Sequence, residues 1–184
     1  LRSAMREAYA VGESGRRSGG GGLSDIARLL SGSAAGRAIA FHYDVSNEFF
    51  ALFLDRHMIY TSAVYSSPSA SLDEAQEAKM DLVCTKLDLR EHDRLLDVGC
   101  GWGGFVRWAA SRYGAYADGV TLSEAQARYA ATAVRAAGLD GRVRITRADW
   151  RTMRPRQPPH DAVTAIGVLE HVGRRRYVEF CRSM

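Results

Sequence analysis

The residues best suited to binding a ligand form one short segment, Asp97-Val98-Gly99-Cys100-Gly101-Trp102-Gly103, which follows an apolar run and precedes an amphipathic one. Glycines here let the backbone turn sharply and pass close to a ligand, and Asp97 can accept hydrogen bonds from a ligand amine or hydroxyl. The spacing differs from the G-x-G-x-x-G of dinucleotide sites and lacks the Gly-Lys-Ser/Thr of a phosphate-binding loop. It therefore indicates another kind of ligand site, placed between a strand and a helix.

The patterns around this segment alternate between strand and helix. Ser71 and Glu74 have the S-x-x-E spacing of a capping box, and the apolar residues after them recur at helical spacing over about four turns. Downstream we expect a strand over 95–98, a helix closed by Gly114, a strand over 116–120, a helix over 123–137, a strand over 143–146, a strand over 162–166 and a helix from residue 174. Such alternation predicts an α/β fold with a parallel sheet and helices on its faces.

The chain divides into three predicted parts. Residues 1–36 comprise the end of an N-terminal region and a Gly-rich connector over 12–22, and a short amphipathic helix is expected over 23–30. Residues 37–90 form a helical segment, and residues 91–184 hold the four strands. Because four strands are about half of a doubly wound sheet, we expect the fold to be truncated in its C-terminal half.

Composition excludes several classes of protein. Of the 184 residues, 46% are hydrophobic and 25% are charged, which is typical of a globular chain and excludes collagen, coiled coils and wholesale disorder. No apolar run approaches the roughly 18 residues of a membrane-spanning helix, and the start lacks the apolar core of a signal peptide, so we expect a cytoplasmic protein. Three cysteines without C-x-x-C spacing argue against a disulfide framework, and no metal site is expected. A net charge of +4 permits attraction to an anionic membrane surface, and no nucleic-acid partner is expected.

The glycine segment resembles the D-x-G-x-G motif of S-adenosylmethionine-dependent methyltransferases with a Rossmann-like, class I fold. The resemblance implies that S-adenosylmethionine is the cofactor. It also implies that the cofactor-binding residues in this segment are Asp97, Gly99, Gly101, Trp102 and Gly103.

Two later segments extend this ligand edge, because the carboxyl ends of parallel strands meet at one edge of a sheet. Thr121 and Leu122 end the second strand, where a ribose is expected, and Thr121 and Gln126 supply the polar contacts because no acidic residue stands at the strand tip. Asp149 and Trp150 end the third strand, where the carboxylate can accept from an adenine amino group and the indole can cover the ring. The alternative for Trp150 is a side chain that closes the edge of the core.

Residues 42–65 are polar and aromatic in a pattern that a scaffold helix does not need. The segments are His42-Tyr43-Asp44, Asn47-Glu48-Phe49-Phe50 and Tyr60-Thr61-Ser62-Ala63-Val64-Tyr65. They resemble the H-Y-D-x-x-N-x-F-F and Y-S-C-A-Y-F segments of cyclopropane-fatty-acyl-phospholipid synthases and mycolic acid cyclopropane synthases. The resemblance extends over residues 37–184 through motifs that match in order and spacing at 95–104, 119–126 and 167–173.

The resemblance implies a lipid-modifying enzyme. In that family the cis double bond of an unsaturated phospholipid acyl chain attacks the methyl group of S-adenosylmethionine, and loss of a proton from the resulting cation closes a cyclopropane ring. A bound bicarbonate takes the proton, and the catalytic glutamate that helps to hold it corresponds to Glu170, for which a helix-start carboxylate is the structural alternative. The resemblance also implies that Tyr43 and Tyr60 line the cofactor and acyl pocket, with Tyr43 and Ser62 among the catalytic residues and Tyr60 and Thr61 among the cofactor-binding ones. Thr61 and Ser62 stand where the family usually has serine and cysteine. The hydroxyl of Ser62 can still donate a hydrogen bond to the anion.

In this interpretation residues 37–90 are the helical cap of the cofactor and part of the lipid pocket, in a protein bound peripherally to a membrane. Two enzymatic alternatives stay open. The same cation can lose a proton from a neighbouring carbon and leave a methyl or methylene branch, and a small-molecule methyltransferase would not need residues 41–65. The non-enzymatic alternative is a cofactor-binding relic or interaction module. A homo-oligomer is compatible with each of these functions.

Overall fold

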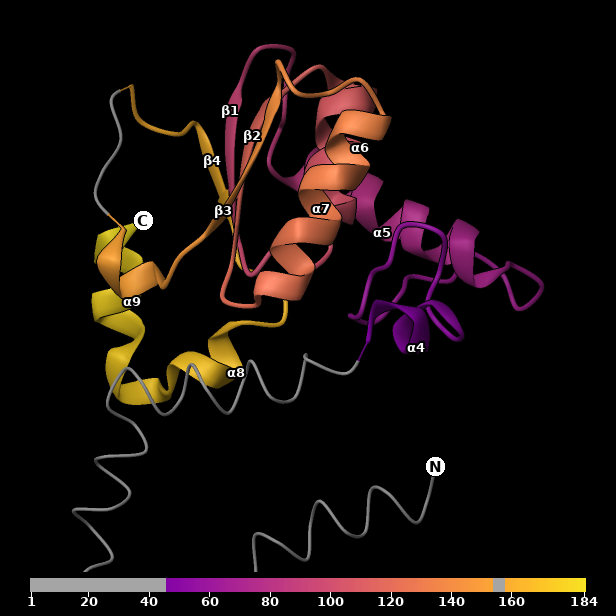
Figure 1. Cartoon of the computed structure of the whole chain (residues 1–184), viewed down its shortest axis with the longest axis horizontal. Coiled ribbons are helices and arrows are strands. Elements are labelled where there is room, and N and C mark those ends of the chain that lie inside the picture. The colour runs from indigo at the N-terminus through magenta and orange to yellow at the C-terminus, as the bar shows by residue number, and fades with distance from the viewer. Residues whose placement is uncertain (1–45, 154–157) are drawn as a thin grey trace, which may run out of the picture. The chain divides into compact units, whose positions relative to one another are not determined.

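The computed structural model describes residues 46–153 and 158–184. The expected Gly-rich connector, the expected helix over 23–30 and Tyr43 lie outside the described residues. Within the described part, the sheet has the strand order β3-β2-β1-β4 and consists of β1 (Arg94–Val98), β2 (Tyr116–Thr121), β3 (Val143–Arg147) and β4 (Ala162–Thr164) (Figure 1).

Every pair of neighbouring strands in this sheet is parallel, which confirms the predicted α/β architecture. In the register of the sheet, Asp97 lies opposite Gly119 of β2 and Thr164 of β4. β4 ends at Thr164 rather than at the expected residue 166. The chain leaves the ladder there because it turns at Gly167, where φ is +74°.

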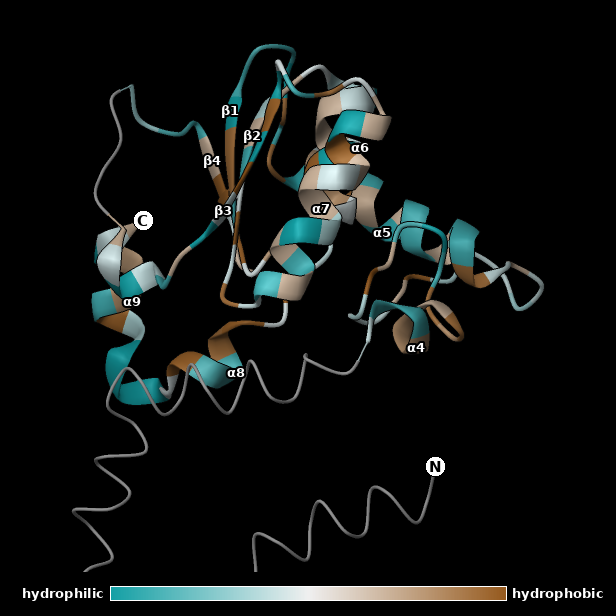
Figure 2. Ribbon diagram, viewed as in Figure 1, coloured by the Kyte–Doolittle hydropathy of each residue, from teal (hydrophilic) through white to brown (hydrophobic). Residues whose placement is uncertain are grey.

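Helices cover both faces of the sheet (Figure 1). One face carries α5 (Leu72–Lys86), α6 (Gly104–Tyr113) and α7 (Glu124–Ala136), and the other carries α8 (Leu169–Val172) and α9 (Tyr177–Ser183). Strand side chains alternate between the faces, so Leu95 joins the first core cluster and Leu96 the second. Hydrophobic residues accordingly concentrate on the strands, while α5 and α7 also carry hydrophilic residues (Figure 2).

Capping residues fix the helix ends where the sequence predicted them. The Ser71 hydroxyl accepts from the Glu74 N–H, and the Glu74 carboxylate accepts from the Ser71 N–H, which completes the capping box of α5. At the start of α7, the Ser123 hydroxyl accepts from the Gln126 N–H at 3.2 Å. Gly114 closes α6 with φ of +69°. These contacts satisfy backbone groups that helix ends leave unpaired.

The remaining elements are short: α4 (Asn47–Ala51), η1 (Trp150–Thr152) and η2 (Arg174–Arg176). The helix expected from residue 174 begins as η2, because the Arg176 N–H donates to the Gly173 carbonyl at 2.9 Å in a three-residue turn, and it continues as α9. None of the helices in the described ranges is long and apolar enough to cross a membrane.

Candidate functional site

The turn after β1 holds three glycines in the left-handed region of backbone conformation. The φ angle is +79° at Gly99, +54° at Gly101 and +77° at Gly103. Side chains with a Cβ rarely adopt this region. The N–H groups of Gly99 and Cys100 donate to the Val120 carbonyl at 2.7 and 2.9 Å, respectively. The turn is therefore fixed against the end of β2.

At two of these three positions, neighbouring atoms leave no room for a side chain, whereas the third glycine faces open space. A Cβ at Gly99 would lie 2.3 Å from Cγ2 of Val168, and a Cβ at Gly103 would lie 2.9 Å from Cβ of Ala130. At Gly101, no atom of the described chain lies within 4 Å of the corresponding position. Gly101 is thus the point of the turn at which a ligand can approach the backbone closely.

Asp97 is a buried carboxyl group one residue before the end of β1. Its Oδ1 accepts from the Thr164 hydroxyl at 2.8 Å. Burial raises the pKa of Asp97 to about 7, while the hydrogen bond from Thr164 and the positive charge of Lys79 oppose that rise. Near neutral pH the group can therefore act as a donor or as an acceptor.

The residues at the end of β2 that were predicted to contact a ribose form hydrogen bonds with one another. The buried Thr121 hydroxyl donates to Oε1 of the buried Gln126 at 2.7 Å, and the Ser123 N–H donates to the Thr121 hydroxyl at 3.3 Å. Leu122 is half-buried, and its carbonyl accepts from Arg147 at 3.3 Å. Thr121 and Gln126 shape the turn into α7, and their contact with a ribose stays a prediction.

The predicted adenine contacts at the end of β3 also have partners within the chain. Asp149 forms an ion pair with Arg151, whose Nε donates to Oδ1 at 2.8 Å, and this hydrogen bond lowers the pKa of Asp149. The Trp150 ring packs edge-on against Phe180 with centroids 5.1 Å apart, and the Arg176 guanidinium lies 5.1 Å from the Trp150 ring centroid. These contacts favour a side chain that closes the core edge. Adenine binding by Asp149 and Trp150 stays a prediction.

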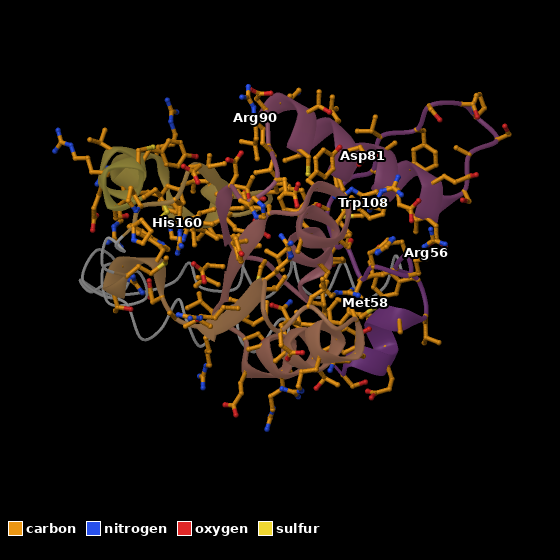
Figure 3. The ribbon with its side chains drawn as sticks, turned by 90° about the horizontal axis from the view of Figure 1, so that it is seen from above. Arg56, Met58, Asp81, Arg90, Trp108 and His160 are labelled. Carbon is orange, nitrogen blue, oxygen red and sulfur yellow. The ribbon has the colours of Figure 1, made fainter. Side chains whose placement is uncertain are left out.

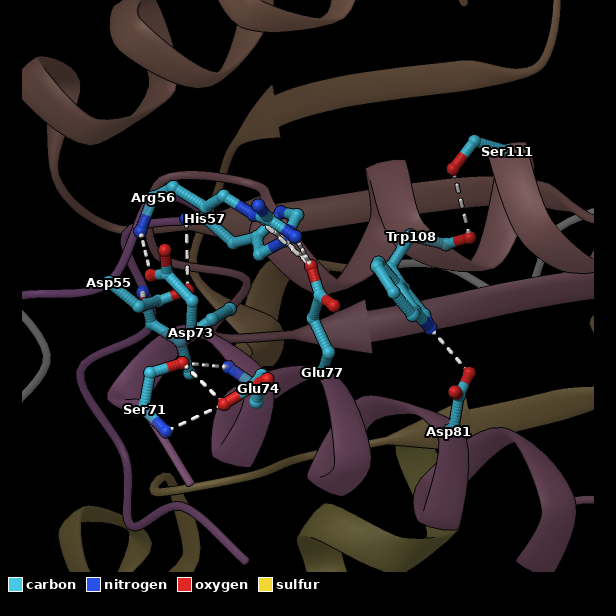
Figure 4. Close-up of polar contacts among 11 residues, drawn as sticks. Asp55, Arg56, His57, Ser71, Asp73, Glu74, Glu77, Asp81, Trp108 and Ser111 are labelled. Carbon is cyan, nitrogen blue, oxygen red and sulfur yellow. Dashed lines mark hydrogen bonds and ion pairs between the residues drawn. The ribbon is translucent and has the colours of Figure 1, made fainter. Parts of the chain in front are cut away.

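A polar network fixes residues 55–59 against α5 (Figure 4). The buried Asp55 carboxylate accepts from the N–H groups of His57 at 2.9 Å and Ile59 at 2.7 Å. Nε2 of His57 lies 2.8 Å from Oε1 of Glu77 in α5. The loop that leads to the Tyr60-Thr61-Ser62 segment therefore has a defined conformation.

The same loop is held by α6, which is bonded to α5. Nε1 of Trp108 donates to Oδ1 of Asp81 at 2.8 Å (Figures 3 and 4). The Tyr113 hydroxyl donates to the same oxygen at 3.0 Å. At the start of α6, a Cβ at Gly104 would lie only 2.4 Å from the His57 carbonyl oxygen. Gly104 thus allows the backbone of the loop to contact α6 directly.

α4 covers the side chain of Trp102, which belongs to the glycine turn. The indole is buried, its Nε1 donates to Oδ1 of Asn47 at 2.8 Å, and its ring centroid lies 4.7 Å from that of Phe50. Tyr60 packs edge-on against Phe50 with centroids 5.3 Å apart, and it stays 46% exposed. Any contact of Trp102 with a cofactor must therefore come from its backbone, whereas the ring of Tyr60 is accessible.

Thr61 and Glu170 both lie beside Gly167, in the turn after β4. A Cβ at Gly167 would lie 2.9 Å from Cγ2 of Thr61 and 3.8 Å from Oε1 of Glu170. Glu170 is exposed in α8, and Ser62 is exposed beside Thr61. Val168, between Gly167 and α8, is the residue that approaches the glycine turn. Three segments distant in sequence therefore border one region at the carboxyl edge of the sheet.

Sequence reasoning missed two polar residues on the buried face of α5. Nε2 of Gln76 donates to the Thr61 carbonyl at 2.8 Å, and Nζ of Lys79 donates to Oγ1 of Thr61 at 2.6 Å. Both side chains are buried. Their spacing places them on the helix face of the buried Met80 and Cys84. Polar residues on an apolar helix face were the signal that could have predicted this contact.

Two curated proteins are similar to this chain over most of its length. A probable fatty acid methyltransferase from Pseudomonas putida is 43% identical over 147 residues, which are 80% of this chain and 37% of that protein. The probable fatty acid methyltransferase Rv3720 from Mycobacterium tuberculosis is 45% identical over 149 residues, which are 81% of this chain and 34% of that protein. The chain thus spans about a third of the length of these relatives.

A solved structure shares the fold. The mycolic acid cyclopropane synthase CmaA1, crystallised with SAH and CTAB, has a TM-score of 0.75 and 36% identity, with coverage of 80% of this chain and 51% of that chain. This similarity confirms the class I Rossmann-like methyltransferase fold. The sequence profile described as mycolic acid cyclopropane synthetase matches residues 31–184. The chain therefore belongs to the mycolic acid cyclopropane synthetase family.

Proposed function

We propose that the full-length protein is an S-adenosylmethionine-dependent enzyme that transfers a one-carbon unit to the cis double bond of an unsaturated phospholipid acyl chain. One observation carries the proposal: the glycine turn, Thr61 and Glu170 converge at the turn over 167–168. Membership of the family supports a lipid substrate, and both curated relatives are named as fatty acid methyltransferases.

The carboxyl edge of the sheet fits a cofactor with an adenosine end and an amino-acid end. There is open space beside Gly101, whose backbone is in the left-handed region, and Asp97 has a buried carboxyl group one residue before the end of β1. Thr121 ends β2 and Asp149 lies two residues after β3, so we expect the adenosine there and the amino-acid end near β1 and β4. When bound, S-adenosylmethionine supplies an electrophilic methyl group. The crystallisation of CmaA1 with SAH supports this cofactor.

Glu170 is proposed as the residue that compensates positive charge on the alkylated acyl chain. Its carboxylate is exposed beside Gly167, where it can face a substrate. A preorganised negative charge stabilises a developing cation most where water is excluded. Glu170 can also accept a hydrogen bond from the hydroxyl group of a bicarbonate ion, and Ser62 can donate a hydrogen bond to the same ion. These two residues would hold the acceptor for the departing proton. Tyr43, which the resemblance assigns to the pocket, lies outside the described residues.

Exposed apolar side chains near the site support an acyl substrate and peripheral binding to a membrane surface. They are Phe49, Leu52, Phe53, Tyr60, Val64 and Tyr65. Phe49 and Phe53 are 5.4 Å apart between ring centroids, so they form a connected aromatic surface. Contiguous exposed apolar surface is typical of a binding site.

Two products can follow from the same transfer. A cyclopropane forms if the cation loses a proton from the added methyl group. If the cation loses a proton from a neighbouring chain carbon instead, a methyl-branched alkene results, and a hydride shift followed by loss of a methyl proton leaves a methylene branch. We propose the cyclopropane as the product, in keeping with the family. The branched product is the second candidate, because both curated relatives are named as methyltransferases and Ser62 replaces the usual cysteine.

Analysis of lipids from a host that expresses the full-length gene tests the proposed reaction. Mass spectrometry is expected to show that monounsaturated phospholipid chains gain the mass of one CH2 group. NMR of the isolated lipid then separates ring from branch. Unmodified acyl chains in the presence of folded protein that binds S-adenosylhomocysteine would exclude these lipids as substrates.

Replacing Glu170 with Gln tests the proposed catalytic carboxylate, because the change removes the charge and keeps the shape. We expect turnover on unsaturated phospholipid to fall by roughly a hundredfold, with cofactor affinity and melting temperature nearly unchanged. Glu91→Gln is the matched control, because Glu91 is an exposed carboxylate before β1 at the opposite edge of the sheet. Equal turnover by the two variants would remove Glu170 from the mechanism.

A further inference from the structure

Lys79 is a buried lysine that the proposed reaction does not use. It lies within α5 with 7% of its surface exposed, and its Nζ donates to the Thr61 hydroxyl oxygen at 2.6 Å. An ammonium group has no lone pair, so in this contact the Thr61 hydroxyl can only accept. The proton of the Thr61 hydroxyl is therefore directed to another acceptor. Lys79 thus determines that Thr61 acts as a donor.

The backbone around Thr61 is fixed by the same helix. Gln76 donates to the Thr61 carbonyl at 2.8 Å, and the Val64 N–H donates to the Ala75 carbonyl at 3.1 Å. α5 therefore sets both the position of Thr61 and the role of its hydroxyl group. A donor held in this way loses little conformational freedom when a ligand binds.

Thr61 lies at the β1 and β4 side of the carboxyl edge. Its methyl group approaches the position beside Gly167, which follows β4, and its partner Lys79 acts electrostatically on Asp97 of β1. The proposed adenosine contacts lie on the other side, at the ends of β2 and β3. Thr61 consequently faces the part of the edge that is left for the amino-acid end of the cofactor.

Resting on the proposed function, we infer that Lys79 is a positioning residue that fixes the Thr61 hydroxyl as a hydrogen-bond donor to the carboxylate of the cofactor's amino-acid end. A hydroxyl polarised by an ammonium group is a stronger donor, and the positive charge favours a carboxylate over an amine at this point. Burial lowers the pKa of Lys79 to about 8, whereas the carboxylates of Asp55 and Asp97 raise it. Lys79 is therefore mostly protonated at neutral pH.

The Lys79→Met variant of the full-length protein tests the inference, because methionine keeps an unbranched side chain, one atom shorter, and removes the donor. Two ligands are compared by titration calorimetry: S-adenosylhomocysteine and 5′-methylthioadenosine, which lacks the amino-acid end. We expect Lys79→Met to weaken S-adenosylhomocysteine binding by about tenfold or more and to leave 5′-methylthioadenosine binding unchanged. Lys86→Met is the matched control, since Lys86 is the exposed last residue of α5, and neither affinity should change.

A double-mutant cycle shows whether Lys79 acts through Thr61. Thr61→Val removes the hydroxyl and should lower S-adenosylhomocysteine affinity as Lys79→Met does, while Thr61→Ser keeps the hydroxyl and the affinity. The double variant should bind no more weakly than Thr61→Val alone, because both changes remove one contact. The Thr61 variants also provide the test by themselves if Lys79→Met fails to fold.

The outcomes separate the inference from the proposed function. Wild-type protein that binds neither ligand contradicts the proposed cofactor. Wild-type protein that binds both, with Lys79→Met affinities unchanged, overturns the inference alone. Equal losses for the two ligands overturn it as well, because they indicate a general effect on the fold. Additive losses in the double variant show that Lys79 does not act through Thr61.

Discussion

Replacing Gly101 with alanine separates ligand binding from the shaping of the turn. Gly101 has φ of +54°, and an alanine in this region is less stable than glycine by about 1 kcal/mol. No steric destabilisation adds to this value, because the described chain has no atom within 4 Å of the added Cβ. Gly101→Ala should therefore lower the free energy of unfolding by about 1 kcal/mol and the melting temperature by roughly 2–4 °C.

Gly138→Ala is a control with the same backbone change and no expected ligand. Gly138 follows α7 with φ of +66°, and in the described chain nothing lies within 4 Å of its added Cβ either. α7 begins at the carboxyl edge of the sheet and ends at the opposite edge, so Gly138 is remote from the glycine turn. The free energy of unfolding should therefore fall by the same amount in both variants.

Their ligand affinities should differ. A methyl group at Gly101 occupies space that the cofactor is proposed to use, so S-adenosylhomocysteine affinity should fall by roughly tenfold or more, since overpacking by one methyl group commonly destabilises by 1–3 kcal/mol. Gly138→Ala should keep the wild-type affinity. Thermal unfolding and titration calorimetry on the full-length variants measure both quantities. Equal affinities for S-adenosylhomocysteine would refute the assignment of Gly101 to the cofactor site.

Two further predictions concern stability. Trp102→Phe removes the hydrogen bond to Asn47 and part of the contact with Phe50, so we expect a loss of about 1–2 kcal/mol, and an unchanged melting temperature would contradict it. In the folded protein the pKa of Asp97 is about 7, whereas the ordinary value for an aspartate is 3.8. Between these two pH values the folded state therefore keeps a proton that the unfolded state has lost. Its contribution to stability is present below pH 4 and is lost as pH rises to 7, by up to ~4 kcal/mol. The free energy of unfolding, measured as a function of pH, should not show this loss in Asp97→Asn. Identical pH profiles for the variant and the wild type would show that Asp97 is not the titrating group.

Local signals in the sequence predicted most of the fold. The capping box at Ser71 and Glu74 and the glycine at 114 mark helix ends through contacts within a few residues, so their spacing is visible in the sequence. The β4 end was predicted too late, because an apolar run continues to residue 166 although the chain leaves the sheet at Thr164. Apolar composition indicates burial but does not determine which residues pair in the ladder.

The sequence predicted which segments form the site better than it predicted what the individual side chains contact. The D-x-G-x-G spacing located the turn, since left-handed backbone at three positions requires glycine there. It did not show that the indole of Trp102 is buried and bonds to Asn47, because that contact depends on a partner 55 positions earlier in the chain. Contacts between distant segments, such as Thr61 with Lys79, leave only a weak signal: a polar residue on an apolar helix face.

The structure accommodates the threonine at position 61 through two such contacts. By the resemblance, the family usually has serine at this position, and threonine keeps a hydroxyl, which here accepts from Lys79. The additional methyl group needs space, and that space exists because residue 167 is glycine: a Cβ there would be 2.9 Å from the Thr61 methyl. The β-branched side chain is also restricted about χ1. Threonine therefore keeps the proposed donor of serine and restricts its orientation further, which is consistent with a hydroxyl that must point to one acceptor.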